Sequence, residues 1–440
     1  MARGRRRGAS GLDALEGGRP LATPTAASVA EVRRLPTNVL RKVEPPEKPG
    51  PMPLVRLAMS LLFLFLVAFA AWVIGWWPVT CLFCVLPFVG LAGARSVARR
   101  FARAALGRED AAPSPEGPAR DDPSPAAPAD EAAASGLGGF LADPEDPRRA
   151  MLTAPLRPHL RARVERNRAA EAGACAAWLA RRGGPEGVDV TSGDGCALHA
   201  RVFRAEPTGA GAGGRQRWVV LLHDYRGSWE ETMPLVRRYV EAGFSAVVCD
   251  LRACGESAGE WVGLGYLDSL DVVAWARWAV GEGARSVVLH GSGMGAAAAL
   301  MAAGEEDLPG EVAAVVAENC YTDAWTAARC LYHGLGLDVH PAMDLVRLYL
   351  RHQPGGYDMA AASPQEYLRD LRVGVLFLQG ARDTLVPPYM STLLWRSACE
   401  LTPQLDHRIE SFGKAGHLTL ELAEPERYWR TVFDFLSRRV

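Results

Sequence analysis

The chain has 440 residues, of which 49% are hydrophobic and 22% charged, so it is long enough for one large globular domain with additional segments. Its formal net charge of −1 excludes a global electrostatic field that recruits nucleic acid, and we expect no nucleic-acid partner. The nine cysteines are scattered and odd in number, which does not fit a disulfide framework and favours reduced thiols in the cytoplasm.

Two segments have the composition of disordered chain. Residues 1–53 form a basic N-terminal tail that is rich in Gly, Ala, Pro and Arg and has no apolar periodicity. Residues 99–150 are rich in Pro, Ala, Asp and Glu over most of their length. We expect this second segment to be a flexible linker that lets the following domain move freely.

Residues 54–98 are the predicted membrane-embedded segment. No charged residue occurs between Leu57 and Ala94. This stretch is longer than the roughly 20 residues of one span, and Gly75-Trp76-Trp77-Pro78 divides it, so we predict a helical hairpin with arms 57–74 and 79–94. One long span with the following domain outside is the alternative.

Arginines flank the uncharged stretch on both sides: Arg56 lies before it, and Arg95, Arg99, Arg100 and Arg103 lie after it. Because basic residues mark the cytoplasmic side, the hairpin would have both ends in the cytoplasm. We therefore expect the lipid bilayer as a partner, and a location at the cell membrane with the domain on its cytoplasmic side.

Residues 151–440 show apolar strand-like runs alternating with helical segments, which indicates an α/β domain with a mostly parallel sheet covered by helices on both faces. The expected strands are 218–222, 244–249, 286–289 and 373–378, and the expected helices are 230–242, 264–280, 390–400 and 424–438. Residues 320–362 are too long for a plain connection, so we expect a small helical cap over a pocket there. Ordinary packing of its aromatic side chains is an equally good interpretation.

The sequence His290-Gly291-Ser292-Gly293-Met294-Gly295 follows an expected strand and precedes an alanine-rich helical segment. It has the pattern of a nucleophile elbow, a sharp strand-to-helix turn that presents its central side chain at the tip. Framing the turn by Gly291 and Gly295 puts Gly293 at the tip. A shifted frame with Ser292 at the tip places bulky His290 and Met294 where the turn needs small residues.

The other parts of a serine-hydrolase site follow in chain order. Asp383 comes after the expected strand 373–378, and His417 comes after the next one, as a Ser, Asp, His order requires. Asp383 would orient and stabilise the imidazole of His417, the candidate base. The backbone N–H groups of Tyr225 and Met294 are the candidate oxyanion donors.

Five sequence blocks resemble those of the α/β-hydrolase superfamily, most closely its esterase-, thioesterase- and serine-peptidase-like branch. The resemblance runs from about Val188 to Val440, and the blocks begin at His223, Asp250, Gly291, Gly380 and Ala415. By position it implies the acid at Asp383, the base at His417, the oxyanion donors at Tyr225 and Met294, and the nucleophile at Gly293.

Three residues depart from the pattern of this family. Gly293 stands in place of the nucleophilic serine, Asp224 in place of the glycine of an H-G pair, and Ala253 in place of the glycine of D-x-R-G. A carboxylate at Asp224 opposes stabilisation of a developing anion by the neighbouring amides. The resemblance together with these changes implies a hydrolase relative whose catalysis is lost or strongly reduced.

We therefore expect a membrane-anchored relative of hydrolases of esters, thioesters or peptides that binds a partner or a small apolar or acyl-type ligand. We expect no cofactor and no metal, because no phosphate loop, dinucleotide fingerprint or metal-ligand spacing occurs. The alternative is an active hydrolase that uses Ser292, or a water molecule activated by His417. A third interpretation makes the tail and hairpin the functional part.

Overall fold

The computed structural model describes residues 52–73, 93, 95–100, 102–103, 106–108, 152–205, 216–334 and 342–440. Most of the predicted basic tail, the second membrane arm apart from residue 93, and the linker from 109 to 150 lie outside these residues. The structural statements below concern the described residues.

A single eight-stranded sheet organises the domain, with the strand order β1-β2-β4-β3-β5-β6-β7-β8. β2 pairs antiparallel with both β1 and β4, and the remaining neighbours pair in parallel. The strands are β1 (Glu186–Thr191), β2 (Ala197–Phe203), β3 (Arg217–Leu222), β4 (Phe244–Cys249), β5 (Ser286–Ser292), β6 (Val312–Glu318), β7 (Gly374–Gly380) and β8 (Arg408–Phe412).

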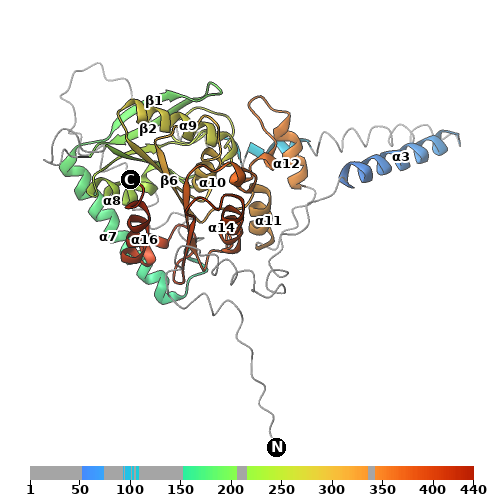
Figure 1. Cartoon of the computed structure of the whole chain (residues 1–440). Coiled ribbons are helices and arrows are strands. Elements are labelled where there is room, and N and C mark those ends of the chain that lie inside the picture. The colour runs from blue at the N-terminus through green and yellow to red at the C-terminus, as the bar shows by residue number, and fades with distance from the viewer. Residues whose placement is uncertain are drawn as a thin grey trace, which may run out of the picture.

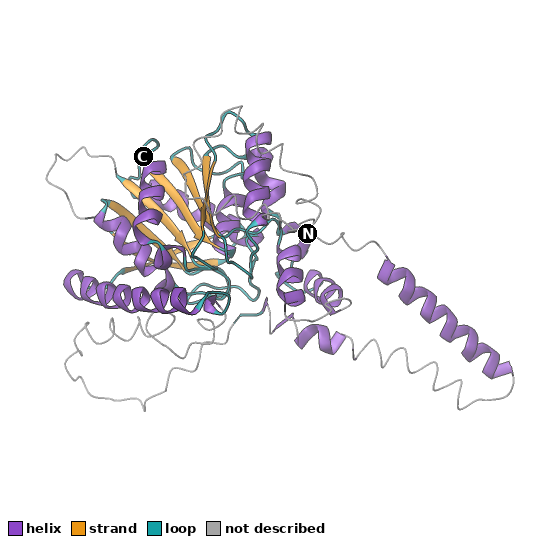
Figure 2. Cartoon of the chain, turned by 90° about the horizontal axis from the view of Figure 1, so that it is seen from below, coloured by secondary structure: helices purple, strands orange, loops and turns teal. Residues whose placement is uncertain are grey.

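The central strands are continuous apolar runs because helices cover both of their faces. Every residue of β7 is buried, and β3 is buried from Trp218 to Leu222. In Figure 2 the sheet lies between two layers of helices. α9 (Tyr266–Gly281), α10 (Met294–Ala302) and α14 (Tyr389–Leu401) pack in one core, and α7 (Pro158–Arg182), α8 (Met233–Glu241), α15 (Leu420–Ala423) and α16 (Pro425–Leu436) pack in the other.

Most expected elements of the domain appear with small shifts. The expected strand 286–289 is longer, because β5 continues to Ser292 before the chain turns. Part of the expected helix 230–242 is a short 3-10 helix, Trp229–Thr232, followed by α8. The remaining short segments are α13 (Pro364–Tyr367) and the 3-10 helices Met359–Ala361 and Leu368–Asp370.

The expected cap at 320–362 contains two helices, α11 (Ala324–Gly334) and α12 (Ala342–Arg351). Its aromatic side chains at Trp325 and Tyr357 are buried in the core, and the Tyr357 hydroxyl donates to the carbonyl of Val262 at 2.7 Å. The ring of Tyr349 meets that of Trp261 edge to face. These side chains serve packing, in agreement with the second interpretation of this segment.

The first arm of the predicted hairpin corresponds to α3 (Met52–Val73), which stands apart from the domain in Figure 1. Several of its large apolar side chains are exposed, among them Met59, Leu61, Leu62, Phe63, Phe65, Leu66 and Phe69. Within the described part of the chain, no helix meets the length and apolarity needed to cross a membrane. The hairpin therefore stays a prediction.

The start of the predicted linker is packed on the domain. Ala102 and Leu106 are buried in the core that contains α9 and α10, and Gly107 forms an antiparallel bridge with Trp261. A flexible linker would therefore begin only after Arg108, because the residues before it make fixed contacts.

Candidate functional site

The turn between β5 and α10 has the geometry that a nucleophile elbow requires. Gly293 follows the last residue of β5, Ser292, and precedes α10, with φ of 52° and ψ of −109°. A side chain strains the backbone in this region, whereas glycine adopts it freely. The N–H of Gly293 donates to the carbonyl of Glu318 on the neighbouring strand β6, which fixes the position of the turn.

The two outer glycines of the turn lie too close to other backbone atoms for a side chain. A Cβ atom on Gly291 would lie 2.2 Å from the carbonyl carbon of Gly295, and one on Gly295 would lie 2.4 Å from the carbonyl oxygen of Leu222. These contacts agree with the frame in which Gly291 and Gly295 flank the tip residue Gly293.

Three residues from three loops form a hydrogen-bonded row beside this turn. His417 Nδ1 lies 2.7 Å from Asp383 Oδ2, and His417 Nε2 lies 2.8 Å from Asp224 Oδ2. The structure thus joins the expected acid and base, and it adds a second carboxylate on the nitrogen that would face a serine hydroxyl. All three side chains are buried or nearly so.

The second oxygen of the Asp224 carboxylate occupies the predicted oxyanion site. The N–H of Met294 donates to Asp224 Oδ1 at 2.7 Å, and the N–H of Tyr225 also hydrogen-bonds this carboxylate. Both predicted oxyanion donors therefore converge on a side chain of the protein itself. The sequence indicated that Asp224 would oppose oxyanion binding, and the structure shows that its carboxylate fills the site.

Glycine at position 293 makes this arrangement possible. A Cβ atom there would lie 1.9 Å from Asp224 Oδ1 and 2.4 Å from Asp224 Cγ. Such an approach is far inside van der Waals contact, so a serine at position 293 and the observed rotamer of Asp224 exclude each other. The position of the Asp224 carboxylate therefore depends on the absence of a side chain at Gly293.

The charges at this site stabilise an imidazolium. Burial lowers the pKa of His417, but the negative charges of Asp383 and Asp224 outweigh it and raise the pKa well above its usual value. Burial raises the pKa of Asp224, while the charge of His417 and the two backbone N–H groups hold it below its usual value. Both ring nitrogens of His417 therefore carry protons that point at carboxylates.

A buried chain of hydrogen bonds ends at Glu318, beside this row. Tyr239 Oη lies 2.9 Å from His290 Nδ1, His290 Nε2 lies 3.1 Å from Tyr428 Oη, and Tyr428 donates to Glu318 Oε2 at 2.8 Å. Burial lowers the pKa of His290 to about 3, so it is neutral. Since Tyr428 donates to Glu318, the Nε2–H of His290 donates to Tyr428, and Tyr239 donates to Nδ1.

The sequence indicated that His290 would be a satisfied structural histidine, and this network agrees. It did not reveal Glu318, whose carboxyl has a pKa that burial raises to about 7. The available signal was a charged residue directly after the apolar run of β6, at the edge of the sheet where the elbow lies.

A small pocket reaches Asp224 from the side of α8 and α15. Its lining is partly apolar and partly acidic: His223, Asp224, Glu231, Thr232, Pro234, Leu235, Ser292, Glu318, Leu418, Glu421 and Leu422. None of the described residues of the expected cap, 320–334 and 342–362, belongs to this lining. Ser292 thus faces this pocket, and the two ring nitrogens of His417 are bonded to Asp383 and Asp224 instead.

His223 holds the loop that carries Asp224. Its Nδ1–H donates to the carbonyl of Asp224 at 2.7 Å, and its Nε2 accepts from the N–H of Leu251 at 3.1 Å. The loops after β3 and β4 are therefore tied together next to the site. Among the described residues, no group of three or more His, Cys, Asp and Glu side chains is placed to hold a metal ion.

The mostly parallel sheet, the elbow after β5, and an acid and a histidine on the loops after β7 and β8 decide the fold and confirm the predicted fold class of the domain. The chain has the α/β-hydrolase fold. It is 24% identical over 265 residues to the Arabidopsis thaliana protein "Alpha/beta hydrolase domain-containing protein WAV2", and the match covers 58% of this chain and 79% of that protein. No protein-family model matches this chain.

Solved structures of esterases and peptidases are similar to this chain. Pyrococcus furiosus esterase Pf2001 is 21% identical, with a TM-score of 0.45, and the match covers 58% of this chain and 92% of that one. Pyrococcus horikoshii acylaminoacyl peptidase is 16% identical, with a TM-score of 0.43, and the match covers 58% of this chain and 41% of that one.

Proposed function

We propose that this α/β hydrolase, which is related to esterases and peptidases, has lost hydrolysis and binds a ligand or partner at a membrane. The observation that carries the proposal is the Asp224 carboxylate, bonded at once to His417 and to the N–H of Met294. It takes the places that a nucleophilic hydroxyl and a substrate oxyanion need. A site so occupied cannot begin acyl transfer by the serine mechanism.

Three requirements of that mechanism are unmet. The nucleophile position is Gly293, which has no hydroxyl. The base must be neutral to accept a proton, whereas His417 is held as a cation between two carboxylates. Loss of the nucleophile alone lowers turnover on the order of a million-fold, and the activity that survives depends on the oxyanion donors. Here those donors are bonded to Asp224.

The geometry does not favour the alternative of an active hydrolase. Ser292 lines the pocket that also includes Asp224, but His417 Nε2 is bonded to Asp224 rather than to Ser292. Activation of water by His417 requires a free, neutral Nε2. Here Nε2 carries a proton, and its N–H group donates a hydrogen bond to the carboxylate of Asp224.

The support for a membrane location is the apolar surface of α3. The uncharged sequence from 57 to 94 includes most of this helix, and its phenylalanine and leucine side chains are exposed. A lipid environment removes such side chains from water, which is the favourable term for anchoring. We propose that the domain lies on the cytoplasmic side, because arginines flank both ends of the uncharged stretch.

The pocket limits the class of ligand. Pro234, Leu235, Leu418 and Leu422 offer apolar contacts to a small apolar or acyl-type molecule. The same pocket contains the carboxylates of Asp224 and Glu231, which repel an anion. Burial raises the pKa of Glu318 to about 7 and that of Glu421 to about 8, so these two carboxyl groups do not supply a cationic partner for an anion either. We therefore propose a neutral acyl compound rather than a free fatty acid.

Putting back the residues of the family pattern at positions 224 and 293 tests the loss of hydrolysis. The full chain is assayed with aryl esters of short and long acyl groups as wild type, Gly293→Ser, and Asp224→Gly with Gly293→Ser. We expect activity only in the double variant, because only there do a hydroxyl and free oxyanion donors occur together. A double variant of Asp224→Gly with Gly293→Ala is the matched control, since it opens the same space without a hydroxyl.

Two outcomes contradict this proposal. Ester hydrolysis by the wild type that disappears with His417→Gln shows a working site. Labelling of the wild type by a fluorophosphonate that disappears with Ser292→Ala shows that Ser292 is a nucleophile. Labelling of the double variant at the hydroxyl introduced at position 293, with silence in the wild type, supports the proposal independently of the choice of ester.

A further inference from the structure

Residues 95–108, which directly follow the uncharged stretch, have one face packed on the domain. Residues 95–100, 102–103 and 106 are helical. Ala98, Ala102 and Leu106 are each at most 4% exposed, and their spacing of four residues places them on one side of a helix. Small side chains along this stripe let the helix lie close against the domain.

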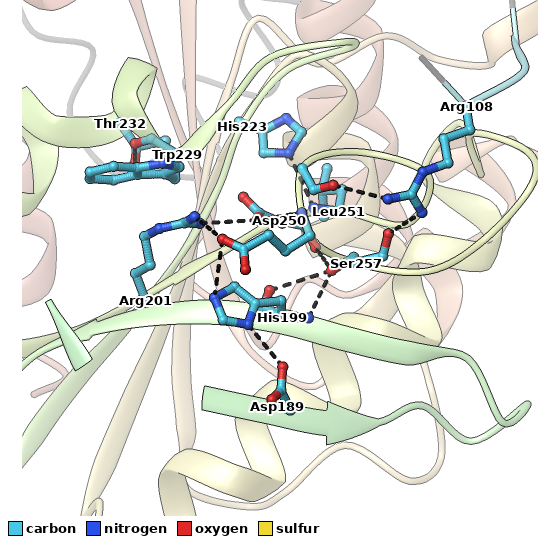
Figure 3. Close-up of polar contacts among 12 residues, drawn as sticks. Arg108, Asp189, His199, Arg201, His223, Trp229, Thr232, Asp250, Leu251 and Ser257 are labelled. Atoms are coloured by element: carbon cyan, nitrogen blue, oxygen red, sulfur yellow. Dashed lines mark hydrogen bonds and ion pairs between the residues drawn. The ribbon is translucent and has the colours of Figure 1, made fainter. Parts of the chain in front are cut away.

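The end of this segment is hydrogen-bonded to the loop after β4. The N–H of Val262 donates to the carbonyl of Leu106 at 2.7 Å, and the N–H of Arg108 donates to that of Glu260 at 2.9 Å. The Arg108 guanidinium donates to the carbonyls of Ser257 at 2.7 Å and Gly255 at 3.1 Å. Figure 3 shows Arg108 reaching across to this loop.

The loop that receives Arg108 is itself rigidly held. Ser257 Oγ donates to the carbonyl of Asp250 at 2.6 Å and accepts from the N–H of His199 at 2.8 Å. The Asp250 carboxylate pairs with Arg201 at 3.0 Å, whose guanidinium lies over the ring of Trp229. Figure 3 shows these side chains converging on Asp250. The segment is therefore docked on a fixed surface of the domain.

The solvent-exposed surface of the same segment is basic. Arg95, Arg99, Arg100 and Arg103 are all exposed, and no acidic residue occurs between 95 and 108. None of these four guanidinium groups forms a hydrogen bond or ion pair within the described part of the chain. Exposed Val97, at 48%, lies among them. Four like charges without a counter-charge leave this surface complementary to an anionic partner.

We propose that this basic surface, Arg95, Arg99, Arg100 and Arg103, binds the anionic headgroups of a lipid bilayer while the buried stripe of Ala98, Ala102 and Leu106 holds the domain. The proposal rests on the membrane anchoring proposed above, because the segment follows directly on the uncharged stretch 57–94. Each basic residue near an anionic lipid surface strengthens association by about fivefold. We infer an anionic lipid surface as the partner, because the first of these arginines, Arg95, directly follows the uncharged stretch 57–94.

This arrangement fixes the distance and orientation of the domain. At the helical rise per residue, the path from Arg95 to Leu106 covers about 17 Å, whereas a flexible linker of some fifty residues would have an end-to-end distance of about 40 Å. Arg226, on the loop that carries Asp224, also donates to the carbonyl of Gly107. The loops after β3 and β4 therefore lie at the membrane surface, next to the candidate site.

Arginine modification in lipid nanodiscs tests the inference on the full chain. Phenylglyoxal labelling of Arg95, Arg99, Arg100 and Arg103 is quantified by mass spectrometry in phosphatidylcholine discs and in discs that also contain phosphatidylserine. We expect labelling to fall severalfold only in the anionic discs and to recover in high salt. Arg285 and Arg430, exposed on the domain, serve as internal references that stay unchanged.

A matched pair of variants tests orientation. In the first variant, Gln replaces Arg95, Arg99, Arg100 and Arg103. In the second, Gln replaces four exposed arginines elsewhere on the domain, so that the same charge is removed: Arg157, Arg166, Arg285 and Arg430. Energy transfer from tryptophan to dansyl-labelled anionic lipid should fall severalfold only in the first. The inference is overturned if the four arginines are labelled to the same extent in both kinds of disc. It is also overturned if energy transfer is the same in both variants.

Flotation of the full chain on pure phosphatidylcholine vesicles separates the two proposals. Failure to float there contradicts the anchoring proposed above. If the four arginines are nevertheless protected by anionic vesicles, the basic surface stands as a lipid-binding surface without an anchor. If the chain floats and the arginines are labelled equally in both lipids, anchoring stands and the basic surface does not bind headgroups.

Discussion

Asp224 and Gly293 occupy one space: a Cβ atom at position 293 would lie 1.9 Å from Asp224 Oδ1. The two residues are far apart in the sequence and lie on the loops after β3 and β5. Neighbouring strands β3 and β5 bring them together in parallel register. The absence of a side chain at one position is therefore the condition for the carboxylate at the other.

This relationship predicts a strong coupling in stability. Gly293→Ser alone should destabilise the domain by about 2–4 kcal/mol, because it adds steric overlap and backbone strain. In the Asp224→Gly background the same change should cost at least about 1 kcal/mol less. Thermal unfolding of the four chains measures this coupling energy. Additive changes would show that the two side chains do not compete for space.

His417 predicts a dependence of stability on pH. Its pKa is raised in the folded state, so the resulting stabilisation is complete below about pH 6.5, the usual imidazole value, and is lost as the pH rises toward the folded pKa. The difference in Tm between wild type and His417→Gln should therefore narrow between about pH 6.5 and pH 9. A difference that widens over this range would contradict an imidazolium at position 417.

The tyrosine–histidine network predicts unequal effects of two similar substitutions. Tyr428→Phe leaves both the Nε2–H of His290 and an oxygen of Glu318 without their partner and should cost about 1–3 kcal/mol. Tyr239→Phe removes only the donor to His290 Nδ1 and should cost less. Urea unfolding of both variants checks the order. Equal costs would contradict the assigned direction of the hydrogen bonds.

The docked segment predicts that the stable domain begins before residue 109. Leu106 is 4% exposed and packs in the main core, so Leu106→Ala in the full chain should destabilise the domain by about 2 kcal/mol. Leu401→Ala is the control, because Leu401 is 51% exposed and its loss should change stability by less than about 0.5 kcal/mol. Identical unfolding temperatures for the two variants would mean that the segment is not docked.

The sequence predicted most of the domain because its signals are local. The apolar runs that became β3, β4 and β7 are bounded by turn residues, and burial on both faces demands such runs. The pairing of Asp383 with His417 could likewise be predicted from the places of these residues after late strands. The packing of residues 98–108 was missed, since alanines at a spacing of four in an arginine-rich segment give a weak signal of burial.

The sequence by itself determined the α/β architecture, the order of the site loops, and the absence of a hydroxyl at Gly293. Only the tertiary structure decided where the Asp224 carboxylate goes, because its partners Met294 and His417 lie 70 and 193 residues away along the chain. The strength of an ion pair depends on the distance between the two charged groups and on their burial, and neither can be derived from the local sequence pattern. The fold therefore shows that Gly293 and Asp224 together form one occupied site.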